Sequence, residues 1–280
     1  MIEIEDYPYT DMQLKQRLDG FLRMPMTMMD VQTAYRFILN SIDLTTLEGA
    51  DNNAAIYDLC QKAVSFRNEK KHIPSVAAVC VYSPFVAQAK ALLGQTDVKV
   101  ASVAGAFPAG QSPIEIKLAE VKYALQQGAD EIDLVISRGK FLEGNLQEVY
   151  NEIRAIREAC STAKLKVILE TGELKTPQNI YKASQLAIVA GADFIKTSTG
   201  KISVGATLDA FLVMMDAVKR HHQKTGRKVG IKAAGGISDS ETALQYIHLL
   251  CLILGKDWLS NTYFRIGASR LATKVFDEIQ

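Results

Sequence analysis

The chain has 280 residues, and its 32 Lys and Arg residues nearly balance its 31 Asp and Glu residues, for a formal net charge of +1. Hydrophobic residues make up 48% of the chain and charged residues 22%, which is ordinary for a globular protein and excludes a disordered, collagen-like or coiled-coil chain. The near-zero charge argues against nucleic acid as a partner, because proteins that bind it carry basic surfaces.

Membrane, secretory and metal-binding features are not apparent in the sequence. No apolar run reaches the ~20 residues that a bilayer helix needs, so we expect no membrane contact. The first six residues are acidic where a secretory signal would be basic and then apolar. Cys60, Cys80, Cys160 and Cys251 form no C-x-x-C pair, so neither a zinc site nor a disulfide scaffold finds support. We expect a reduced, cytoplasmic protein without a bound metal.

The first 40 residues precede the main pattern of the chain. Leu14, Leu18, Phe21 and Leu22 lie on one face of a predicted helix. The pattern predicts an N-terminal helical extension over residues 1–40. We expect this helix to cap the bottom of the domain that follows, and a contact in a homodimer is the alternative.

From residue 41 onward, short runs rich in Val and Ile alternate with longer amphipathic stretches. Such runs are typical of buried parallel strands, which need helical crossovers between them. Eight strand–helix units in about 240 residues is the count of a TIM barrel, which we predict for residues 41–280, with a doubly wound open sheet as the alternative. The strands are expected at Ser41–Thr45, Val76–Tyr82, Val98–Val103, Glu131–Ile136, Lys164–Glu170, Asp193–Thr197, Lys228–Ala233 and Phe264–Ala268.

Polar residues lie in or end several of these strands, and the active site of a TIM barrel lies at the C-terminal ends of its strands. Asp43 lies in the first predicted strand and Asp133 in the fourth, and Lys196 and Lys232 lie near the ends of the sixth and seventh. We expect these side chains to converge on the mouth of the barrel. Glu170, at the end of the fifth strand, is either a carboxylate in the wall of the site or simply polar packing.

The two lysines favour amine chemistry. A lysine at an apolar strand end is costly to bury, although Lys196 alone could extend its ammonium group to solvent. Lowering a lysine pKa from ~10.4 to ~7 requires roughly 4.6 kcal/mol. A like charge at ~4 Å, with an effective dielectric constant of ~20, is worth about 4 kcal/mol. Lys232 together with partial burial can therefore hold Lys196 uncharged, as a Schiff-base nucleophile requires.

The acidic residues of the fourth strand have different expected roles. Asp133 lies between two apolar residues, and we interpret it as a proton acceptor for a substrate hydroxyl, with a structural aspartate or a holder of a lysine as alternatives. Asp130 and Glu131 are expected to form a solvated entry to this strand. Cys80 is expected to act as a small core hydrophobe.

Glycine-rich turns follow the seventh and eighth strands. Gly235 and Gly236 form the first, and the segment Gly267–Arg270 opens the last helix. TIM barrels often bind phosphate with these two loops, because backbone N–H groups and a helix dipole attract the anion. Lys201 could add a cation from the preceding loop. We therefore expect a phosphate site here, with turn glycines that bind no ligand as the alternative.

Segments across most of the chain, from about Ser41 to the end, resemble those of the deoxyribose-phosphate aldolase family, in its order. The most specific part is Lys-Thr-Ser-Thr-Gly at 196–200 with the downstream Lys232 and Gly235–Gly236. The other matching segments are DLTTL (43–47), AVCVY (78–82), DEIDLV (130–135) and VILETGEL (167–174).

The resemblance implies a metal-independent class I aldolase on a TIM barrel. Such an enzyme needs no cofactor, and it reversibly cleaves 2-deoxy-D-ribose 5-phosphate to D-glyceraldehyde 3-phosphate and acetaldehyde. It implies that Lys196 is the Schiff-base lysine, Lys232 the second lysine that perturbs it, and Asp133 the acid of a proton relay. With the turns above, the expected substrate-binding residues are Asp43, Thr45, Thr199, Gly200, Lys201, Gly235, Gly236, Gly267, Ser269 and Arg270.

This chain departs from the family at the expected phosphate site. A basic residue is frequent in the family where Ser238 stands, and a second Ser is frequent where Arg270 stands. We hypothesise that Arg270 restores the missing cation.

Two other functions stay open. Another Schiff-base barrel enzyme, such as a related aldolase or a transaldolase, would act on a different sugar phosphate. A degenerate barrel would bind a phosphorylated ligand or a partner without turnover, but intact Lys196, Lys232 and Asp133 argue against it.

Overall fold

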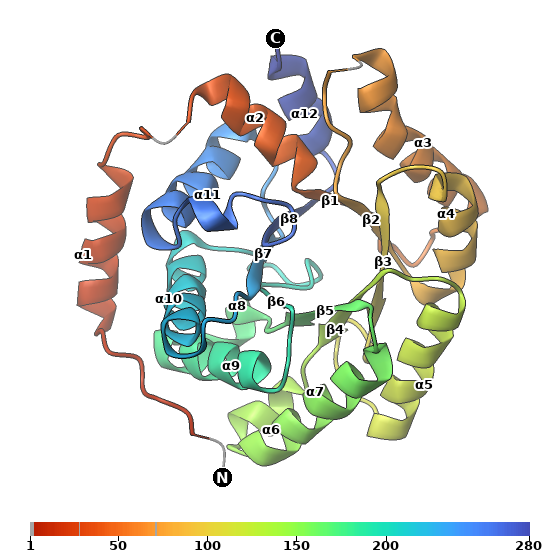
Figure 1. Ribbon diagram of the computed structural model, residues 1–280. Helices are drawn as coiled ribbons and strands as arrows, with labels where there is room; N and C mark the ends of the chain where they lie inside the picture. Colours follow the sequence, from red (N-terminus) through yellow and green to blue (C-terminus); the bar gives the residue numbers. More distant parts are fainter. Residues whose placement is uncertain (1–2, 28, 71) are drawn as a thin grey trace.

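The computed structural model, which describes residues 3–27, 29–70 and 72–280, is a closed barrel of parallel strands surrounded by helices (Figure 1). Each strand pairs with its neighbour in sequence order, and β8 pairs with β1, which closes the sheet. The predicted TIM barrel is confirmed, and the open doubly wound sheet is wrong. The strands are β1 (Ile42–Thr45), β2 (Ala78–Val81), β3 (Lys99–Ala104), β4 (Glu131–Val135), β5 (Lys164–Ile168), β6 (Phe194–Lys196), β7 (Gly230–Ala234) and β8 (Phe264–Ala268).

The register of the strands places ionisable residues side by side within the barrel. Lys196 is the direct partner of Lys232, and Lys232 is also the partner of Arg265. Asp133 is the partner of Lys166. Because these positions are buried, the register alone brings charged groups from neighbouring strands into contact.

The helices of the barrel region lie outside the strands, and some of them begin at a side chain that caps the first turn. Thr176 and Thr207 accept hydrogen bonds from the first turns of α9 and α10, and Gly226 ends α10 with a positive φ of 72°. None of the described helices is both long and apolar enough to cross a bilayer. These helices are α3 (Asn53–Glu69), α4 (Val86–Leu93), α5 (Ile114–Gln126), α6 (Arg138–Leu142), α7 (Leu146–Cys160), α8 (Thr171–Leu174), α9 (Pro177–Val189), α10 (Leu208–Thr225), α11 (Ser240–Ile253) and α12 (Leu271–Glu278), with 3-10 turns η1 (Ser83–Phe85) and η2 (Lys256–Trp258).

The apolar core has two parts. A large cluster fills the layer between strands and helices, and a small separate one, made by Leu47, Cys80, Ala101 and Val103, lies inside the barrel. Tyr82 and Phe107 pack against the small cluster. The barrel interior therefore has an apolar side on β2 and β3, and the charged residues come mainly from the other strands.

Two helices precede the barrel, and the predicted place of the first is wrong. Helix α1 (Asp11–Leu22) lies on the flank of the barrel against α10 and α11, not under its bottom, and α2 (Val31–Asn40) packs against α11 and α12 (Figure 1). Buried Leu14 and Leu18 supply the apolar contact. Arg17 adds a bidentate ion pair with Asp216 of α10, at 2.7 and 2.9 Å.

We predict that this docking contributes measurably to stability. Leu14 is 3% exposed, and truncation to Ala should lower the free energy of unfolding by roughly 2–4 kcal/mol, because it removes buried methyl groups and leaves a cavity. Met12 on the same helix is 69% exposed, so Met12→Ala is the control and should change the free energy of unfolding by less than about 0.5 kcal/mol. Urea unfolding measures both values, and equal losses in the two variants would contradict the docking.

Candidate active site

An open cavity of about 240 Å³ lies at the C-terminal ends of the strands, where TIM barrels carry their active sites. It includes Lys196 and all but one of the expected substrate-binding residues. The exception, Asp43, is fully buried beneath it. The cavity is lined by Thr45, Leu47, Glu48, Lys196, Thr199, Gly200, Lys201, Ala234, Gly235, Gly236, Ile237, Ser238, Gly267, Ala268, Ser269 and Arg270.

Lys196 ends β6 and reaches this cavity with a side chain that is only 3% exposed. Its ammonium nitrogen Nζ lies 2.7 Å from Oδ2 of Asp133. The same carboxylate oxygen accepts a hydrogen bond from Nζ of Lys232, at 2.8 Å. The structure therefore brings together the three residues that the sequence singled out for catalysis, around one carboxylate oxygen.

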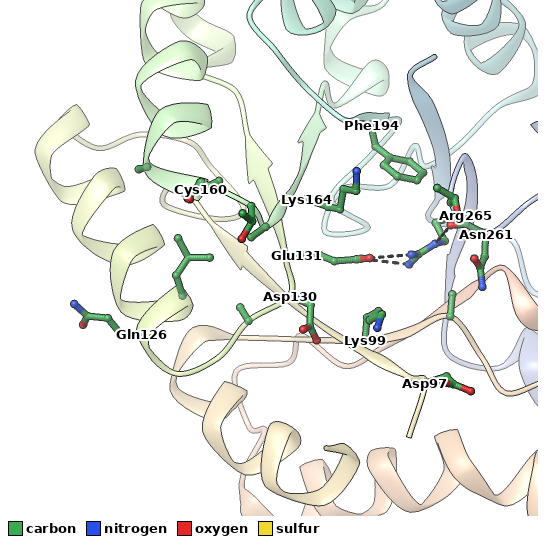
Figure 2. Close-up of a pocket in the computed structure, with 18 residues that line it drawn as sticks. Asp97, Lys99, Gln126, Asp130, Glu131, Cys160, Lys164, Phe194, Asn261 and Arg265 are labelled. Carbon is green, nitrogen blue, oxygen red and sulfur yellow. Dashed lines mark hydrogen bonds and ion pairs between the residues drawn. The ribbon is translucent and has the colours of Figure 1, made fainter. Parts of the chain in front are cut away.

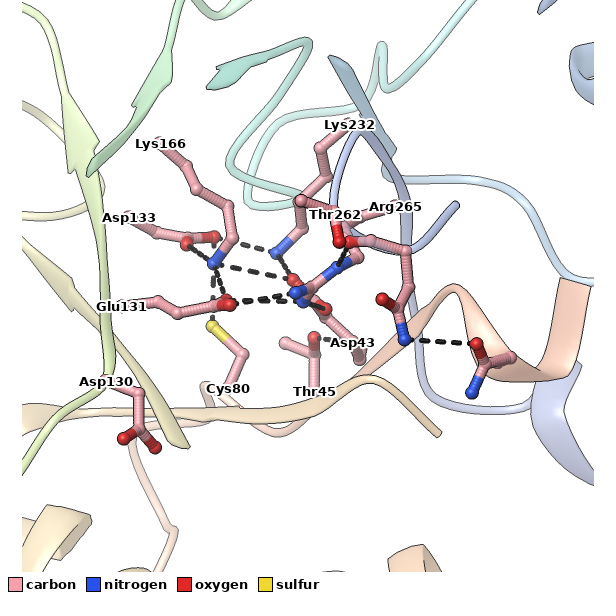
Figure 3. Close-up of polar contacts among 12 residues, drawn as sticks. Asp43, Thr45, Cys80, Asp130, Glu131, Asp133, Lys166, Lys232, Thr262 and Arg265 are labelled. Atoms are coloured by element: carbon pink, nitrogen blue, oxygen red, sulfur yellow. Dashed lines mark hydrogen bonds and ion pairs between the residues drawn. The ribbon is translucent and has the colours of Figure 1, made fainter. Parts of the chain in front are cut away.

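Asp133 is the centre of a larger buried network (Figure 3). Its second oxygen accepts from Lys166 at 2.7 Å, and Lys232 also donates to Asp43. Lys166 in turn forms an ion pair with Glu131, at 2.5 Å. A guanidinium group from β8 completes the set, because Arg265 contacts Asp43 at 2.6 Å and Glu131 at 2.8 Å.

Cations outnumber carboxylates in this network when all the groups are charged. Among the described residues it contains the carboxylates of Asp43, Glu131 and Asp133, against Lys166, Lys196, Lys232 and Arg265. Lys196 pairs with a single carboxylate there, whereas each of the other cations pairs with at least two. An excess charge is expensive in a buried setting, so Lys196 is the group from which a proton is most easily lost.

The pKa shifts of the buried groups agree with this count of charges. Burial lowers the pKa of Lys196, Asp133 opposes that effect, and the charge of Lys232 reinforces it. The pKa of Lys232 is raised, since the attraction of Asp133 and Asp43 outweighs its burial. The pKa of Asp133 is held well below its usual value by three lysines in spite of its burial. Lys232 and Asp133 thus stay charged where Lys196 loses its proton.

Three members of the network were not found from the sequence. Glu131 was expected to be solvated, but it is buried and pairs with Lys166 and Arg265. It lies two residues before Asp133, and alternate residues of a strand face the same side, so both point into the barrel. Lys164 and Lys166 on β5 are also two residues apart and share a side of their strand. The sequence alone does not show whether that side faces into the barrel or out of it, because this depends on the neighbouring strands.

Both expected glycine-rich turns line one end of the cavity. Gly235 and Gly236 have φ values of 86° and 84°, which side chains rarely adopt. Position 267 has no room for a side chain, since a Cβ there would lie 2.9 Å from Ala234 Cβ and 3.2 Å from Lys232 Cε, so only glycine fits. Ser269 and Arg270 are exposed and lie just before α12.

Lys201, expected at the phosphate, has a partner in the structure. Its Nζ lies 2.9 Å from Oε1 of Glu48, which is a largely exposed residue on the opposite rim of the cavity. A bound anion would therefore compete with Glu48 for this cation.

Glu170 is not among the residues that line the cavity, so the structure favours the second of its two expected roles, polar packing, with the carboxylate fixed behind the rim. It is fully buried and holds a left-handed conformation with φ of 59°. Its carboxylate accepts from the backbone N–H of Thr199 at 3.2 Å and from the Thr199 hydroxyl, and Arg138 lies 3.7 Å away. The contact ties the loop after β6 to the end of β5, which places the rim residues beside Lys196.

The three carboxylates of the network are occupied by ammonium and guanidinium groups. In residues 3–27, 29–70 and 72–280, no cluster of His, Cys, Asp and Glu has the arrangement of a metal site. The thiol of Cys80 is 4.0 Å from Asp133, and burial raises its pKa to about 11, so it stays protonated and acts as part of the apolar wall, as expected.

A larger cavity, of about 720 Å³, lies at the opposite end of the barrel (Figure 2). Its walls come from the beginnings of the strands and include Lys99, Asp130, Lys164 and Arg265. Lys196 and the glycine turns are absent from it. The amine chemistry expected of Lys196 therefore belongs to the smaller cavity.

A parallel eight-stranded barrel with a buried lysine at the floor of its C-terminal cavity defines a class of enzyme that can use an amine as nucleophile. The family described as "DeoC/LacD family aldolase" matches residues 37–248. The chain belongs to this aldolase family.

Individual relatives agree with this assignment. The chain is 45% identical over 248 residues to deoxyribose-phosphate aldolase from Homo sapiens and 44% identical over 248 residues to the enzyme of Bos taurus, with 85% of this chain and 78% of each relative covered. Among solved structures, tetrameric deoxyribose phosphate aldolase from Aeropyrum pernix superposes with a TM-score of 0.70 at 25% identity, over 91% of this chain and 98% of that one.

We predict that Glu170→Ala destabilises the fold and loosens the cavity rim. Loss of the carboxylate leaves the buried N–H of Thr199 without its acceptor and removes one of the two charge partners of Arg138, which should lower the free energy of unfolding by about 1–3 kcal/mol. Glu173→Ala is the matched control, because this more exposed carboxylate also pairs with Arg138. Chemical denaturation measures both variants. A loss for Glu173→Ala as large as for Glu170→Ala would show that the Thr199 contact is unimportant.

Proposed function

We propose that this protein reversibly cleaves 2-deoxy-D-ribose 5-phosphate to D-glyceraldehyde 3-phosphate and acetaldehyde, with Lys196 as the Schiff-base lysine. The carrying observation is the position of Lys196, which is buried at the floor of the cavity and paired with a single carboxylate, so that it can be uncharged. The names of the relatives support the substrate.

The reaction begins with attack of the neutral Lys196 amine on the C1 aldehyde of the open-chain sugar. Loss of water gives a protonated imine, whose positive charge lies next to the Asp133 carboxylate that contacts Nζ at 2.7 Å. This anion stabilises the cation as it forms. Lys232 remains charged beside it, which favours the neutral form of the amine before attack.

Carbon–carbon cleavage follows. Asp133 and Lys232 act as one hydrogen-bonded unit that, through water, removes the proton of the C3 hydroxyl. The C2–C3 electrons move into the imine to form an enamine, and C3 becomes the aldehyde carbon of glyceraldehyde 3-phosphate. The proton then returns to the enamine at C2, and hydrolysis of the imine frees acetaldehyde and restores Lys196.

The two-carbon fragment is held against the apolar side of the barrel. Leu47 lines the cavity and belongs to the inner cluster with Cys80, Ala101 and Val103. The phosphate lies at the other end, where the turns at Gly235–Gly236 and 267–270 present backbone N–H groups and Arg270 and Lys201 add charge. Thr45, Thr199, Gly200 and Ser269 provide further polar groups between these ends, and Asp43 acts from below through Lys232.

Four buried thiols, Cys60, Cys80, Cys160 and Cys251, support the proposal of a cytoplasmic enzyme. Assembly into a homodimer remains a prediction, which analytical ultracentrifugation tests.

Reductive trapping tests the proposed function directly. Incubation with acetaldehyde and borohydride should add an ethyl group to Lys196, which peptide mass spectrometry locates. Lys196→Met should abolish the adduct and lower the rate of cleavage of 2-deoxyribose 5-phosphate by roughly 10³-fold or more. Lys219→Met, on an exposed part of α10, is the control and should keep both. Trapping at another lysine, or cleavage of a different sugar phosphate alone, would reject the proposal.

A second prediction concerns the phosphate. Since a bound phosphate has to compete with Glu48 for Lys201, Glu48→Gln should lower the KM for the phosphorylated substrate about 2- to 5-fold, the range for an exposed ion pair. Arg270→Ala should raise the same KM, because the substitution removes a cation from the rim. Steady-state kinetics on 2-deoxyribose 5-phosphate and on unphosphorylated 2-deoxyribose separate these effects on phosphate binding from effects on folding. An unchanged KM in Arg270→Ala would exclude this residue from the phosphate site.

A further inference from the structure

The ion pair at the far end of the network from Lys196 has no role in the mechanism above. Arg265 of β8 and Glu131 of β4 face each other across the barrel, with side chains 6% and 4% exposed, and hydrogen bond at 2.8 and 3.2 Å (Figures 2 and 3). They lie in the wall of the larger cavity, away from the substrate. Two buried charged side chains with no contact to the substrate cavity call for a physical explanation.

Unbroken contacts connect this pair to Lys196. On one side Arg265 contacts Asp43, and Lys232 bridges from Asp43 to Asp133. On the other side Lys166 bridges from Glu131 to Asp133. Asp133 then contacts Lys196. Each link is a direct contact between charged groups that are almost completely buried, so solvent screens them poorly.

The charge of Arg265 accounts for the excess positive charge of the network. Arg265 stays protonated under all conditions in which proteins fold, so its positive charge is permanent. With every group ionised, the four cations exceed the three carboxylates by one, and loss of one lysine proton makes the network neutral. Without Arg265, the fully protonated lysines would already balance the carboxylates. The electrostatic reason for an uncharged Lys196 would then be lost.

We propose that Arg265 and Glu131 are positioning residues that determine, from the end of the barrel where the strands begin, how readily Lys196 gives up its proton. Arg265 supplies the excess positive charge that drives the proton off, and Glu131 limits that excess. The inference rests on the proposed function, since it takes Lys196 as the Schiff-base lysine.

Other charged and titratable groups lie around Lys196 and around the Arg265–Glu131 pair. Those that face Lys196 are Asp133 on β4, Lys232 on β7 and Cys80 on β2. Those around the pair are Asp43 on β1 and Lys166 on β5, with Asp97, Lys99, Asp130 and Lys164 in the wall of the larger cavity.

The test uses substitutions of opposite charge in the full-length protein. In wild-type protein, Arg265→Met, Glu131→Gln and the double variant, the rate of borohydride trapping of acetaldehyde on Lys196 is measured as a function of pH. Removal of a cation favours protonated Lys196, so Arg265→Met should move the midpoint to higher pH. Removal of an anion should move it to lower pH in Glu131→Gln, and the double variant should return close to wild type.

The expected shifts are roughly one pH unit, the size that Coulomb's law gives for a unit charge at ~10 Å with an effective dielectric constant of ~20. Well below the midpoint, this equals about tenfold in the trapping rate at fixed pH, slower for Arg265→Met and faster for Glu131→Gln. Arg17→Met is the matched control, because it also removes a guanidinium from a bidentate carboxylate pair but lies outside the barrel, and its midpoint should not move.

The outcomes separate this inference from the proposed function. If wild-type protein traps no adduct on Lys196, the proposed function fails. If it does, but both single variants shift in the same direction or neither shifts, the positioning role is overturned. A merely structural pair would lower thermal stability and the amount of active protein without opposite shifts of the midpoint. If Arg265→Met does not fold, Glu131→Gln alone decides, and an unmoved or raised midpoint overturns the proposal.

Discussion

The carboxylate of Asp133 is the contact on which the rest of the site depends. Its two oxygens accept from Lys166, Lys196 and Lys232 at 2.7–2.8 Å, and none of these groups has appreciable contact with solvent. A buried ammonium without a partner costs several kcal/mol, so three of them near one point are tolerable only around such an anion. The surplus of positive charge is removed when Lys196, the lysine that reaches the cavity, gives up its proton.

The barrel makes this arrangement possible because it places side chains from separate strands in one layer. Register pairs Lys196 with Lys232, Lys232 with Arg265, and Asp133 with Lys166, so the relative positions follow from backbone hydrogen bonds and not from flexible loops. The surrounding helices contribute by excluding water from the strands. Charges held in this way do not need to reorganise as the reaction proceeds, which is the condition under which electrostatic stabilisation is strongest.

How much of this could be predicted from the sequence depended on where each residue lies in its strand. Lys196, Lys232 and Asp133 occupy apolar strands and the rim turns are rich in glycine, so their positions were predictable. Glu131 begins a strand, where a charge normally meets solvent, and its burial depends on Lys166 and Arg265 from distant parts of the chain. The place of α1 was also beyond prediction. Its apolar face at Leu14 and Leu18 requires a partner but does not specify which one.

The two ends of the cavity obey different physical rules. At the floor, contacts between charges are short, buried and multiple, so a change in one group is felt by the others. At the rim, Lys201 and Glu48 form an exposed pair that is weak enough for an anion to replace, and Gly235 and Gly236 leave backbone N–H groups accessible. Glu170, which follows β5, contacts Thr199, and Thr199 in turn accepts a hydrogen bond from the backbone N–H of Lys201, so the loop that carries Lys201 is held in place. The structure thus combines a rim whose charged groups can change partners with a floor whose charged groups are held by several buried contacts each.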